Sequence, residues 1–155
     1  MGPIVIFDSD SRPAVGRRVT QTAVRDFAAT LQKRVAKGRT FACLITGDAA
    51  LRRFNRLYRL KDYVTDVLSF PSEPGVPGAD PTKLGELAIS ADRALYQARE
   101  HGHSLGDELR ILMLHGVLHL IGLDHESDQG EMARAELRWR KTLALPKSLI
   151  ERARQ

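Results

Sequence analysis

The sequence predicts a single domain of the α+β class, and three observations support this prediction. Four short apolar segments, typical of strands, are separated by longer segments in which apolar residues recur at helical spacing, at irregular intervals along the chain. The chain has 155 residues, enough for one domain with a hydrophobic core, and it contains no internal repeat or long linker. Its hydrophobic fraction of 43% and charged fraction of 28% are ordinary for a globular protein. We therefore expect residues 1–155 to form one domain.

The first half of the chain is expected to alternate between strands and helices. Gly38 stands where helices usually stop, because glycine adopts the left-handed conformation at low cost. Asp48 is expected to cap the helix that follows the second strand. In order, the expected elements are a strand over Ile4–Phe7, a helix over Val19–Ala36, a strand over Phe41–Ile45 and a helix from Asp48 to about Leu60.

The second half contains a long loop, two further strands and a strongly apolar helix. Three prolines and two glycines between Ser72 and Lys83 predict an irregular loop, and loops of this length often border a functional site. Ser104 and Asp107 form a variant capping box at the start of the apolar helix. The expected elements are a strand over Val67–Phe70, the loop over Ser72–Lys83, a strand over Leu87–Ile89, helices over Ala91–Glu100, from Ser104 to just before Gly122 and over Gln129–Leu143, and a short helix from Pro146.

Three of the five histidines fall within one short segment, which runs from His115 to His125. His115 and His119 are four residues apart on an expected helix, so that their rings project from one face a single turn apart. Two imidazoles at this separation can bind one metal ion at Zn–N distances of about 2.0–2.1 Å. Gly122 can adopt a positive φ and turn the chain so that His125 approaches from outside the helix. The spacing therefore predicts a metal site with three histidine ligands.

The predicted ligand set is typical of a catalytic zinc site. Three neutral nitrogen ligands leave one position of a tetrahedral zinc open, whereas structural sites are closed by four protein ligands. We predict one Zn²⁺ per chain, with other divalent transition metals as alternatives, because imidazole also suits iron, copper and nickel. Histidines that are only hydrogen-bonded in the core would not require this spacing across a glycine turn.

The same residues resemble the zinc-binding pattern of the metzincins, H-E-x-x-H-x-x-G-x-x-H, and predict a zincin-like domain. One position differs, because Gly116 stands where that pattern has its glutamate base. A glycine inside a helix costs about 0.5–1 kcal/mol relative to alanine, so we expect a packing reason for it. Without the glutamate, the sequence does not favour a peptidase.

Two interpretations of Asp124 stay open at this point. It can orient a histidine of the metal site through a hydrogen bond, or it can stabilise the turn after Gly122. For His101 and His103 we expect an exposed turn between two helices and no metal role.

Composition limits the compartment and the partners. Cys43 is the only cysteine and lies in an apolar strand, which predicts a buried thiol without catalytic function. No apolar stretch approaches the roughly 20 residues of a membrane span, and the N-terminus lacks the features of a signal peptide, so we expect a cytoplasmic protein. The formal charge of +5, from 24 Lys+Arg and 19 Asp+Glu, fits an anionic partner or simply a solvated basic surface.

Arginines recur along one face of the helix that begins near Asp48. Arg52, Arg56 and Arg59 are spaced at i, i+4 and i+7, which is expected of an ordinary amphipathic surface helix. The alternative is that they bind along a polyanion, because one guanidinium group can donate two parallel hydrogen bonds to phosphate oxygens. Arg59 is the best candidate for such a contact, since it ends the helix and leads through Lys61 towards the strand at Val67.

Several segments together resemble the bacterial YbeY family. They are Asn55, Arg59, Thr65–Pro71, Gly85–Ser90 and His115–His125, and the similarity continues to Glu131 and Met132. The resemblance runs in order from about residue 50 to residue 132, whereas residues 1–45 match only in general layout. YbeY proteins are single-domain, metal-dependent endoribonucleases implicated in ribosomal RNA maturation and ribosome quality control.

The resemblance implies a fold and a role for several residues. The family fold is a mixed, mainly parallel four-stranded sheet, which we expect here with about five or six helices around it. The family's metal ligands fall on His115, His119 and His125, and its arginine at the scissile phosphate falls on Arg59. The implied partners are single-stranded or ribosomal RNA, small-subunit ribosomal proteins and an assembly GTPase, with no membrane.

The chain departs from the family at a few positions near the expected cleft. Tyr63 and Val64 stand where the family commonly has Lys-Pro, and Glu86 and Leu123 replace a frequent Asp and Tyr. These differences bear on substrate preference and leave the histidines unchanged.

The favoured hypothesis is a metal-dependent endoribonuclease that acts on single-stranded RNA in ribosomal RNA maturation. Arg59 would stabilise charge that develops on the phosphate, and Lys61, Arg56 and Arg52 would hold the flanking backbone. The alternatives are a ribosome-assembly factor that only binds, with a structural metal, and a zinc metallopeptidase, which Gly116 disfavours.

Overall fold

A mixed four-stranded sheet organises the computed structural model, which describes residues 1–73, 76–147 and 149–153. The strands follow the order β1-β2-β4-β3, with β1 at Ile4–Phe7, β2 at Thr40–Thr46, β4 at Lys83–Ser90 and β3 at Val67–Pro71. The strands β1, β2 and β4 are parallel, and β3 pairs with β4 in the antiparallel sense. The expected α+β class and the mixed, mainly parallel sheet are therefore confirmed.

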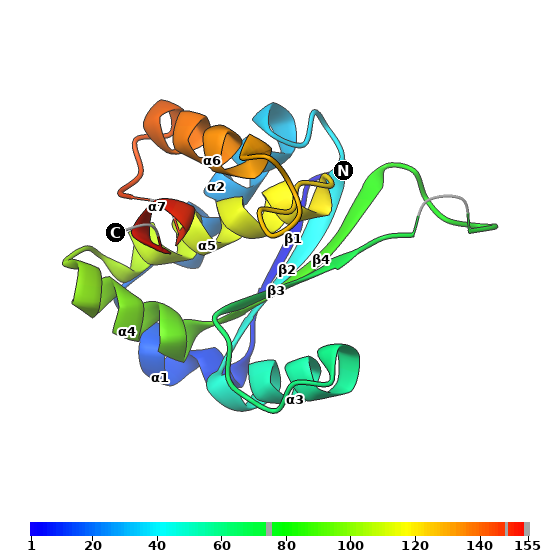
Figure 1. Ribbon diagram of the computed structural model, residues 1–155. Coiled ribbons are helices and arrows are strands. Elements are labelled where there is room, and N and C mark those ends of the chain that lie inside the picture. Colours follow the sequence, from blue (N-terminus) through cyan, green and yellow to red (C-terminus); the bar gives the residue numbers. More distant parts are fainter. Residues whose placement is uncertain (74–75, 148, 154–155) are drawn as a thin grey trace.

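Helices cover both faces of this sheet (Figure 1). On one face α2 (Gln21–Arg34) and α5 (Leu105–Leu120) pack together, and on the other lies α3 (Asp48–Arg59). The described part of the chain holds seven α-helices, slightly more than expected. The remaining helical elements are the 3-10 helix η1 (Ser9–Ser11) and the helices α1 (Arg12–Val15), α4 (Ala91–His101), α6 (Glu131–Thr142) and α7 (Leu149–Ala153).

The main core lies between the sheet and α5. Along β2 the side chains of Phe41, Cys43 and Ile45 point to this face and are buried, as the two-residue period of a strand requires. Helix α5 is buried on nearly all sides, which fits its almost uninterrupted apolar sequence. Its position in the core fixes where its two histidines, near its C-terminal end, can lie.

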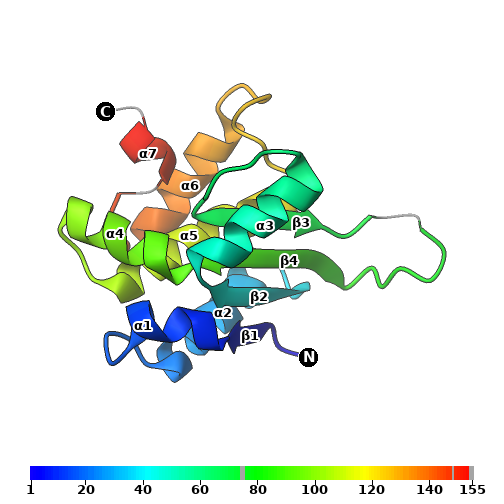
Figure 2. The same cartoon turned by 90° about the horizontal axis from the view of Figure 1, so that it is seen from below.

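The face under α3 has a smaller core. Leu51, Leu68 and Ala88 are buried there, with Phe54 and Phe70 packed against them. Figure 2 shows that α3 lies over β3 and β4, away from the β1 edge. Accordingly, Ile4 and Ile6 on β1 are each 53% exposed. Helix α3 is thus held against the same two strands that run to the histidine region.

Most elements lie where the sequence places them, and the differences have local causes. Strand β4 begins at Lys83, earlier than the expected Leu87, because it pairs with β2 and β3 along its length. The helix expected to start with Asp48 as its cap has Gly47 at that position, and Asp48 Oδ1 instead accepts a hydrogen bond from Ser90 Oγ at 2.7 Å. The short elements η1 and α1 were not expected.

The cap of α5 and the loop after Pro71 lie where they were predicted, whereas the last helix begins later than predicted. Ser104 caps α5 as predicted, accepting a hydrogen bond from Asp107 N at 3.0 Å, although the Asp107 carboxylate binds Arg110. The irregular loop follows Pro71 as predicted, and residues 74–75 of it lie outside the described residues. The last helix begins at Leu149 and not at Pro146, and residue 148 is not described.

Gly85 yields a first prediction, because no other residue fits its place in β4. Its φ is +145°, and a Cβ there would collide with the carbonyl oxygen of Phe70 and lie 2.9 Å from the Cα of Pro71. We expect Gly85→Ala to lower the free energy of unfolding by about 2–4 kcal/mol, from backbone strain and overpacking. Urea unfolding followed by circular dichroism measures this.

A matched control is Gly2→Ala, because a Cβ at Gly2 would meet no atom within 4 Å. This variant should unfold at the wild-type urea concentration. Equal stability of both variants would show that β3 and β4 approach each other less closely than described here.

Candidate metal centre

Three histidines converge at the C-terminal end of α5. The ligand nitrogens of His115, His119 and His125 all lie within 4.8 Å of one another. Their ring centroids are 4.9 Å apart for His115 and His119, and 5.7 and 5.9 Å from His125 to each of the others. Nitrogens at this separation can bind one ion at Zn–N distances of about 2.0–2.1 Å. The predicted triad is therefore assembled in the fold and could bind a metal ion.

A helix stop at Gly122 brings the third histidine to the other two. Gly122 has a φ of +103°, its N–H donates to His119 O at 3.0 Å, and Leu123 N donates to Leu118 O at 3.1 Å. These two bonds are those of a Schellman motif, which reverses the chain at the end of a helix. The reversal places His125 opposite the last turn of α5, as the sequence predicted.

The three histidines differ in burial. His115 is buried, His119 is half-buried and His125 is exposed. Burial, followed by the neighbouring His115 and His125, lowers the pKa of His119 below its usual value of 6.5. His119 therefore stays neutral at physiological pH, and only a neutral imidazole binds a metal.

Glu136 fixes the orientation of His115. The carboxylate, only 1% exposed, lies on α6, and its Oε2 is 2.8 Å from Nδ1 of His115. Since Nδ1 is engaged there, Nε2 is the nitrogen left to face His119 and His125. Carboxylates that hold a ligand histidine in this way set its tautomer and raise its basicity.

The second oxygen of the same carboxylate holds the C-terminal helix. Glu136 Oε1 accepts a hydrogen bond from Ile150 N in α7 at 3.0 Å. Sequence reasoning missed this residue, although it left a signal: Glu136 follows Met132 and Ala135 on the buried face of α6, where a charge requires a partner.

Asp124 serves the turn between Gly122 and α6. Its Oδ1 accepts from Glu126 N at 3.1 Å and its Oδ2 from Ser127 Oγ at 3.2 Å. The Glu126 N–H is the main cause that lowers the pKa of Asp124. Of the two interpretations left open by the sequence, the structure favours the turn. Asp128 acts similarly, accepting from the N–H groups of Gly130 and Met132 at 2.8 Å each.

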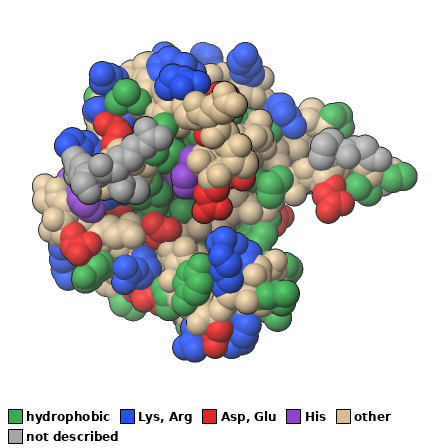
Figure 3. All heavy atoms as spheres, in the orientation of Figure 1, with side chains coloured by type: hydrophobic (Ala, Val, Ile, Leu, Met, Phe, Trp, Pro, Cys, Tyr) green, Lys and Arg blue, Asp and Glu red, His purple; other side chains and the backbone are tan. Residues whose placement is uncertain are grey.

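The histidines open into a cavity of about 490 Å³ that Arg59 also lines. The wall includes Asp66, Ser69 and Leu123, so it draws on the end of α3, on β3 and on the turn after α5. Figure 3 shows a histidine at the surface in the middle of this face, with acidic side chains beside it and Lys and Arg side chains below, over α3. Arg59 and the triad thus share one open cavity.

The end of α3 is held by a buried amide. Asn55 is fully buried, and its Nδ2 donates to Tyr63 O at 3.1 Å. The backbone carbonyl of Asn55 accepts hydrogen bonds from the N–H groups of Leu60 and Lys61, with Leu60 in the left-handed conformation at φ 57°. These bonds fix the chain on both sides of Arg59 and direct it to the cavity.

The other predicted cations lie outside the cavity lining. Arg52 forms a paired contact with Asp62, at 2.8 and 3.2 Å, and Nη1 of Arg56 lies 3.9 Å from the same carboxylate. This contact with Arg52 is the main cause that lowers the pKa of Asp62. Lys61 is exposed. The structure therefore brings Arg59 to the histidines but not Arg52, Arg56 or Lys61.

Gly116 is explained by packing between α5 and β4. A Cβ on Gly116 would lie 2.7 Å from Cδ2 of the buried Leu87. The expected steric reason for this glycine is therefore present. A longer side chain here would be directed at the sheet, and the glutamate of the metzincin pattern has no room.

Two other side chains can be compared with their predictions. Cys43 is buried as predicted, and burial raises the pKa of its thiol to about 12, so it stays protonated. The expectation of an exposed His103 is wrong. Its Nε2 lies 2.6 Å from Oε1 of the buried Glu108, which also binds Arg152 of α7 through two contacts of 3.0 Å.

Comparison with known proteins decides the family. The family model described as "Endoribonuclease YbeY" matches residues 7–144. The chain belongs to the endoribonuclease YbeY family. This confirms the resemblance found in the sequence and extends it to most of the chain.

Individual relatives agree with this assignment. A protein of Solibacter usitatus (strain Ellin6076) named "Endoribonuclease YbeY" is 60% identical over 140 residues, or 90% of this chain and 88% of its own length. A relative of the same name from Helicobacter pylori (strain Shi470) is 45% identical over 119 residues, 77% of this chain and 82% of its own. The solution structure of TM1509 from Thermotoga maritima has a TM-score of 0.56 at 24% identity, covers 92% of this chain and 93% of its own, and supports the fold.

Membership in the endoribonuclease YbeY family makes the chain an RNA-cleaving hydrolase, and the histidine triad gives it a place for a metal ion. Within the described residues, no helix is both long and apolar enough to cross a membrane.

A second prediction follows from the contact between Glu136 and His115. We expect Glu136→Gln to weaken zinc affinity by about 10–100-fold, because the neutral amide no longer raises the basicity of the histidine. Competition with a chromogenic chelator measures this affinity without any substrate. The glutamine has nearly the same shape, so the unfolding curve of the metal-free protein should change much less than in Glu136→Ala.

Glu100→Gln on α4 is a suitable control, since Glu100 is exposed and on another helix. It should bind zinc like the wild type. If Glu136→Gln binds zinc as tightly as the wild type, then the role of Glu136 is only to hold α7.

Proposed function

We propose that residues 1–155 form one metal-dependent endoribonuclease domain that cuts single-stranded RNA at the histidine triad. Family membership supplies the class of reaction. The observation that supports this site is the single cavity lined both by the three histidines and by Arg59. The assignment of roles to individual residues within it is ours.

His115, His119 and His125 would hold one Zn²⁺, for which three nitrogen donors in a half-open site are well suited. When bound, the metal supplies a Lewis acid that polarises a phosphoryl oxygen. Iron, copper and nickel bind the same donors, so the identity of the metal is part of the proposal. Glu136 keeps His115 in the tautomer that presents Nε2 to the ion.

Arg59 would stabilise negative charge that develops on the phosphate during cleavage. Its side chain lines the cavity, and among the described residues it has no hydrogen bond or ion pair that would occupy the guanidinium. A guanidinium can donate two parallel hydrogen bonds to phosphate oxygens. Because Asn55 fixes the backbone around it, little reorganisation is needed at the moment of reaction.

Lys61, Arg56 and Arg52 would contact the flanking backbone outside the cavity, independently of sequence. Lys61 is exposed near the end of α3, whereas Arg52 must share its charge with Asp62. We therefore expect Lys61 to contribute more than Arg52.

The biological setting we propose is ribosomal RNA maturation and ribosome quality control in the cytoplasm. The names of the relatives support an RNA substrate. Small-subunit ribosomal proteins and an assembly GTPase are proposed as partners. The alternative, a ribosome-assembly factor that binds without cutting, is less favoured because the triad leaves a ligand position open.

The metal prediction has two parts. The purified protein should contain about one zinc per chain, and His119→Ala should lose most of it, because two ligands no longer hold the ion. Affinity should fall as the pH drops below about 6.5, since protons then compete for imidazole nitrogens. The lowered pKa of His119 means that this residue keeps its nitrogen available to a lower pH.

Elemental analysis and zinc titration between pH 5 and 8 test both parts. His101→Ala is the matched control, because His101 is exposed at the end of α4 and should not change the zinc content. A protein purified without chelators that neither contains nor rebinds metal would contradict the site.

For Arg59 we expect an effect on turnover. Arg59→Ala should lower kcat by about 10²–10³, the range seen when one transition-state donor is removed. The zinc content should stay unchanged, and RNA affinity should fall only modestly. Arg59→Lys should restore little activity, because a single ammonium cannot form the paired contact.

Single-turnover cleavage of a labelled single-stranded RNA, together with anisotropy binding, separates these effects. Arg53→Ala on the same helix is the control, since Arg53 does not line the cavity. Wild-type cleavage by Arg59→Ala, with weaker RNA binding, would reduce Arg59 to a docking contact. Metal-loaded wild type that binds RNA but never cuts it would favour the assembly-factor alternative.

A further inference from the structure

A second cavity lies on the other side of His119. It measures about 610 Å³, within the range of about 300–1,000 Å³ that is usual for ligand sites. Its wall shares Pro71, His119 and Gly122 with the cavity that holds the triad and Arg59. The two cavities therefore meet at the metal site, and a strand that crosses the metal would enter both.

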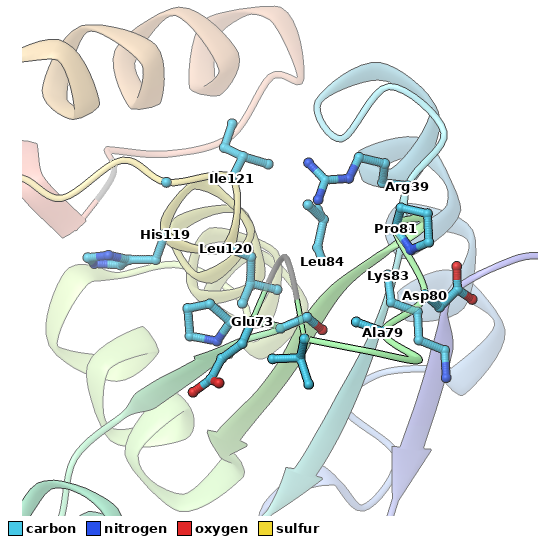
Figure 4. A pocket seen from close by; sticks show the side chains of 14 residues that line it. Arg39, Glu73, Ala79, Asp80, Pro81, Lys83, Leu84, His119, Leu120 and Ile121 are labelled. Carbon is cyan, nitrogen blue, oxygen red and sulfur yellow. The ribbon is translucent and has the colours of Figure 1, made fainter.

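The wall of this second cavity is largely apolar. It is formed by aliphatic side chains and prolines at the end of α5, the start of β4 and the loop between β3 and β4, and Figure 4 shows most of these residues around the opening: Pro71, Val76, Ala79, Pro81, Leu84, Leu120 and Ile121. Ile121 is 38% exposed, so part of this apolar wall is in contact with solvent. An apolar wall of this kind suits the flat face of a nucleobase.

Arg39 adds a guanidinium group to this wall. In Figure 4 its side chain extends over Leu84 towards Ile121 and the end of α5. Among the described residues Arg39 has no side-chain hydrogen bond or ion pair, and in Figure 4 the Asp80 carboxylate, whose Oδ1 accepts hydrogen bonds from Thr82 at 2.6 and 2.9 Å, points away from it. The planar guanidinium is therefore free to stack on a base.

The charges around the cavity favour a base over a phosphate. Arg39 and Lys83 are balanced by Glu73 and Asp80, so that the lining has no net charge to attract an anion. Stacking does not require a net charge, because every base has a π-face that a guanidinium or an apolar side chain can cover. In the neighbouring cavity Arg59 is the only Lys or Arg among the described lining residues, beside Asp66, Asp124 and Glu126, and a metal ion held by the triad would add positive charge there.

We propose that this second cavity is a nucleobase subsite, which holds a base of the RNA strand next to the cleaved bond between Ile121 and Arg39. The inference rests on the proposed function, because its ligand is a flanking nucleotide of the substrate. It adds a contact to the base itself, whereas the residues considered above contact phosphate. Arg39 and Ile121 are then binding residues, and the subsite sets how the strand lies across the metal.

The test uses short single-stranded RNA oligonucleotides in which one base at a time is removed and the ribose-phosphate backbone is kept. With zinc-loaded wild type, removal of one particular base should weaken binding about tenfold, the order expected for one stacked base. In Arg39→Ala and in Ile121→Ser, the intact oligonucleotide should bind about tenfold more weakly than to wild type, and removal of that same base should then cost little further. Fluorescence anisotropy measures binding independently of cleavage.

Arg99→Ala on α4 is the matched control, because it removes the same charge from an exposed position away from both cavities. It should respond to base removal as the wild type does. Zinc content and unfolding curves of all variants show that fold and metal are retained.

Two outcomes would overturn the subsite. In the first, Arg39→Ala and Ile121→Ser bind every oligonucleotide as tightly as the wild type does. In the second, both variants lose the same affinity for every oligonucleotide, including a fully abasic strand, which would indicate a contact with the backbone. Failure of the proposed function looks different, since the wild type would then cut none of the oligonucleotides although base-dependent binding could still be measured.

Discussion

The close contact between α5 and β4 is the constraint on which the rest of the structure depends. Gly116 lets the helix approach Leu87 so closely that no Cβ fits between them. This contact buries α5 in the core and so fixes two histidines, His115 and His119, on its last turns. The hydroxyl of Ser69 on β3 adds a hydrogen bond to Gly116 O at 3.3 Å. The same glycine thus determines the packing of the domain and the absence of a glutamate beside the metal site.

Two carboxylates are buried next to this helix, and each has hydrogen-bond partners. Glu136 and Glu108 are almost completely removed from solvent, which is costly for a carboxylate without partners. Glu136 is bound by His115 and by Ile150 N, and Glu108 by His103 and Arg152. Both carboxylates therefore connect α7 to the layer formed by α5 and α6. The C-terminal helix and the metal site share a hydrogen-bond network, so that neither is an independent part of the domain.

The sequence predicts most of this arrangement where the signal is local. The spacing of three histidines across Gly122 needs only helix geometry and a helix stop, and the triad forms as expected. The short elements η1 and α1 were missed because three or four residues are too few to show a period. Glu136 was missed because its partner is 21 residues away, and only the packing of α6 on α5 brings them together. Arg59 was picked out because it ends the stripe of arginines, but its role at the phosphate came from the resemblance, since the sequence does not show that the end of α3 reaches the histidines.

The graded burial of the three histidines has a kinetic consequence. His115 is held in the core by Glu136, whereas His125 is exposed on the turn that follows Gly122. An ion that leaves this site would lose His125 first, and an entering ion would meet the two helix histidines before the turn closes over it. For a metal ion bound by these three residues, opening of the turn that carries His125 would then limit the rate of exchange, while the two helix histidines would keep their positions.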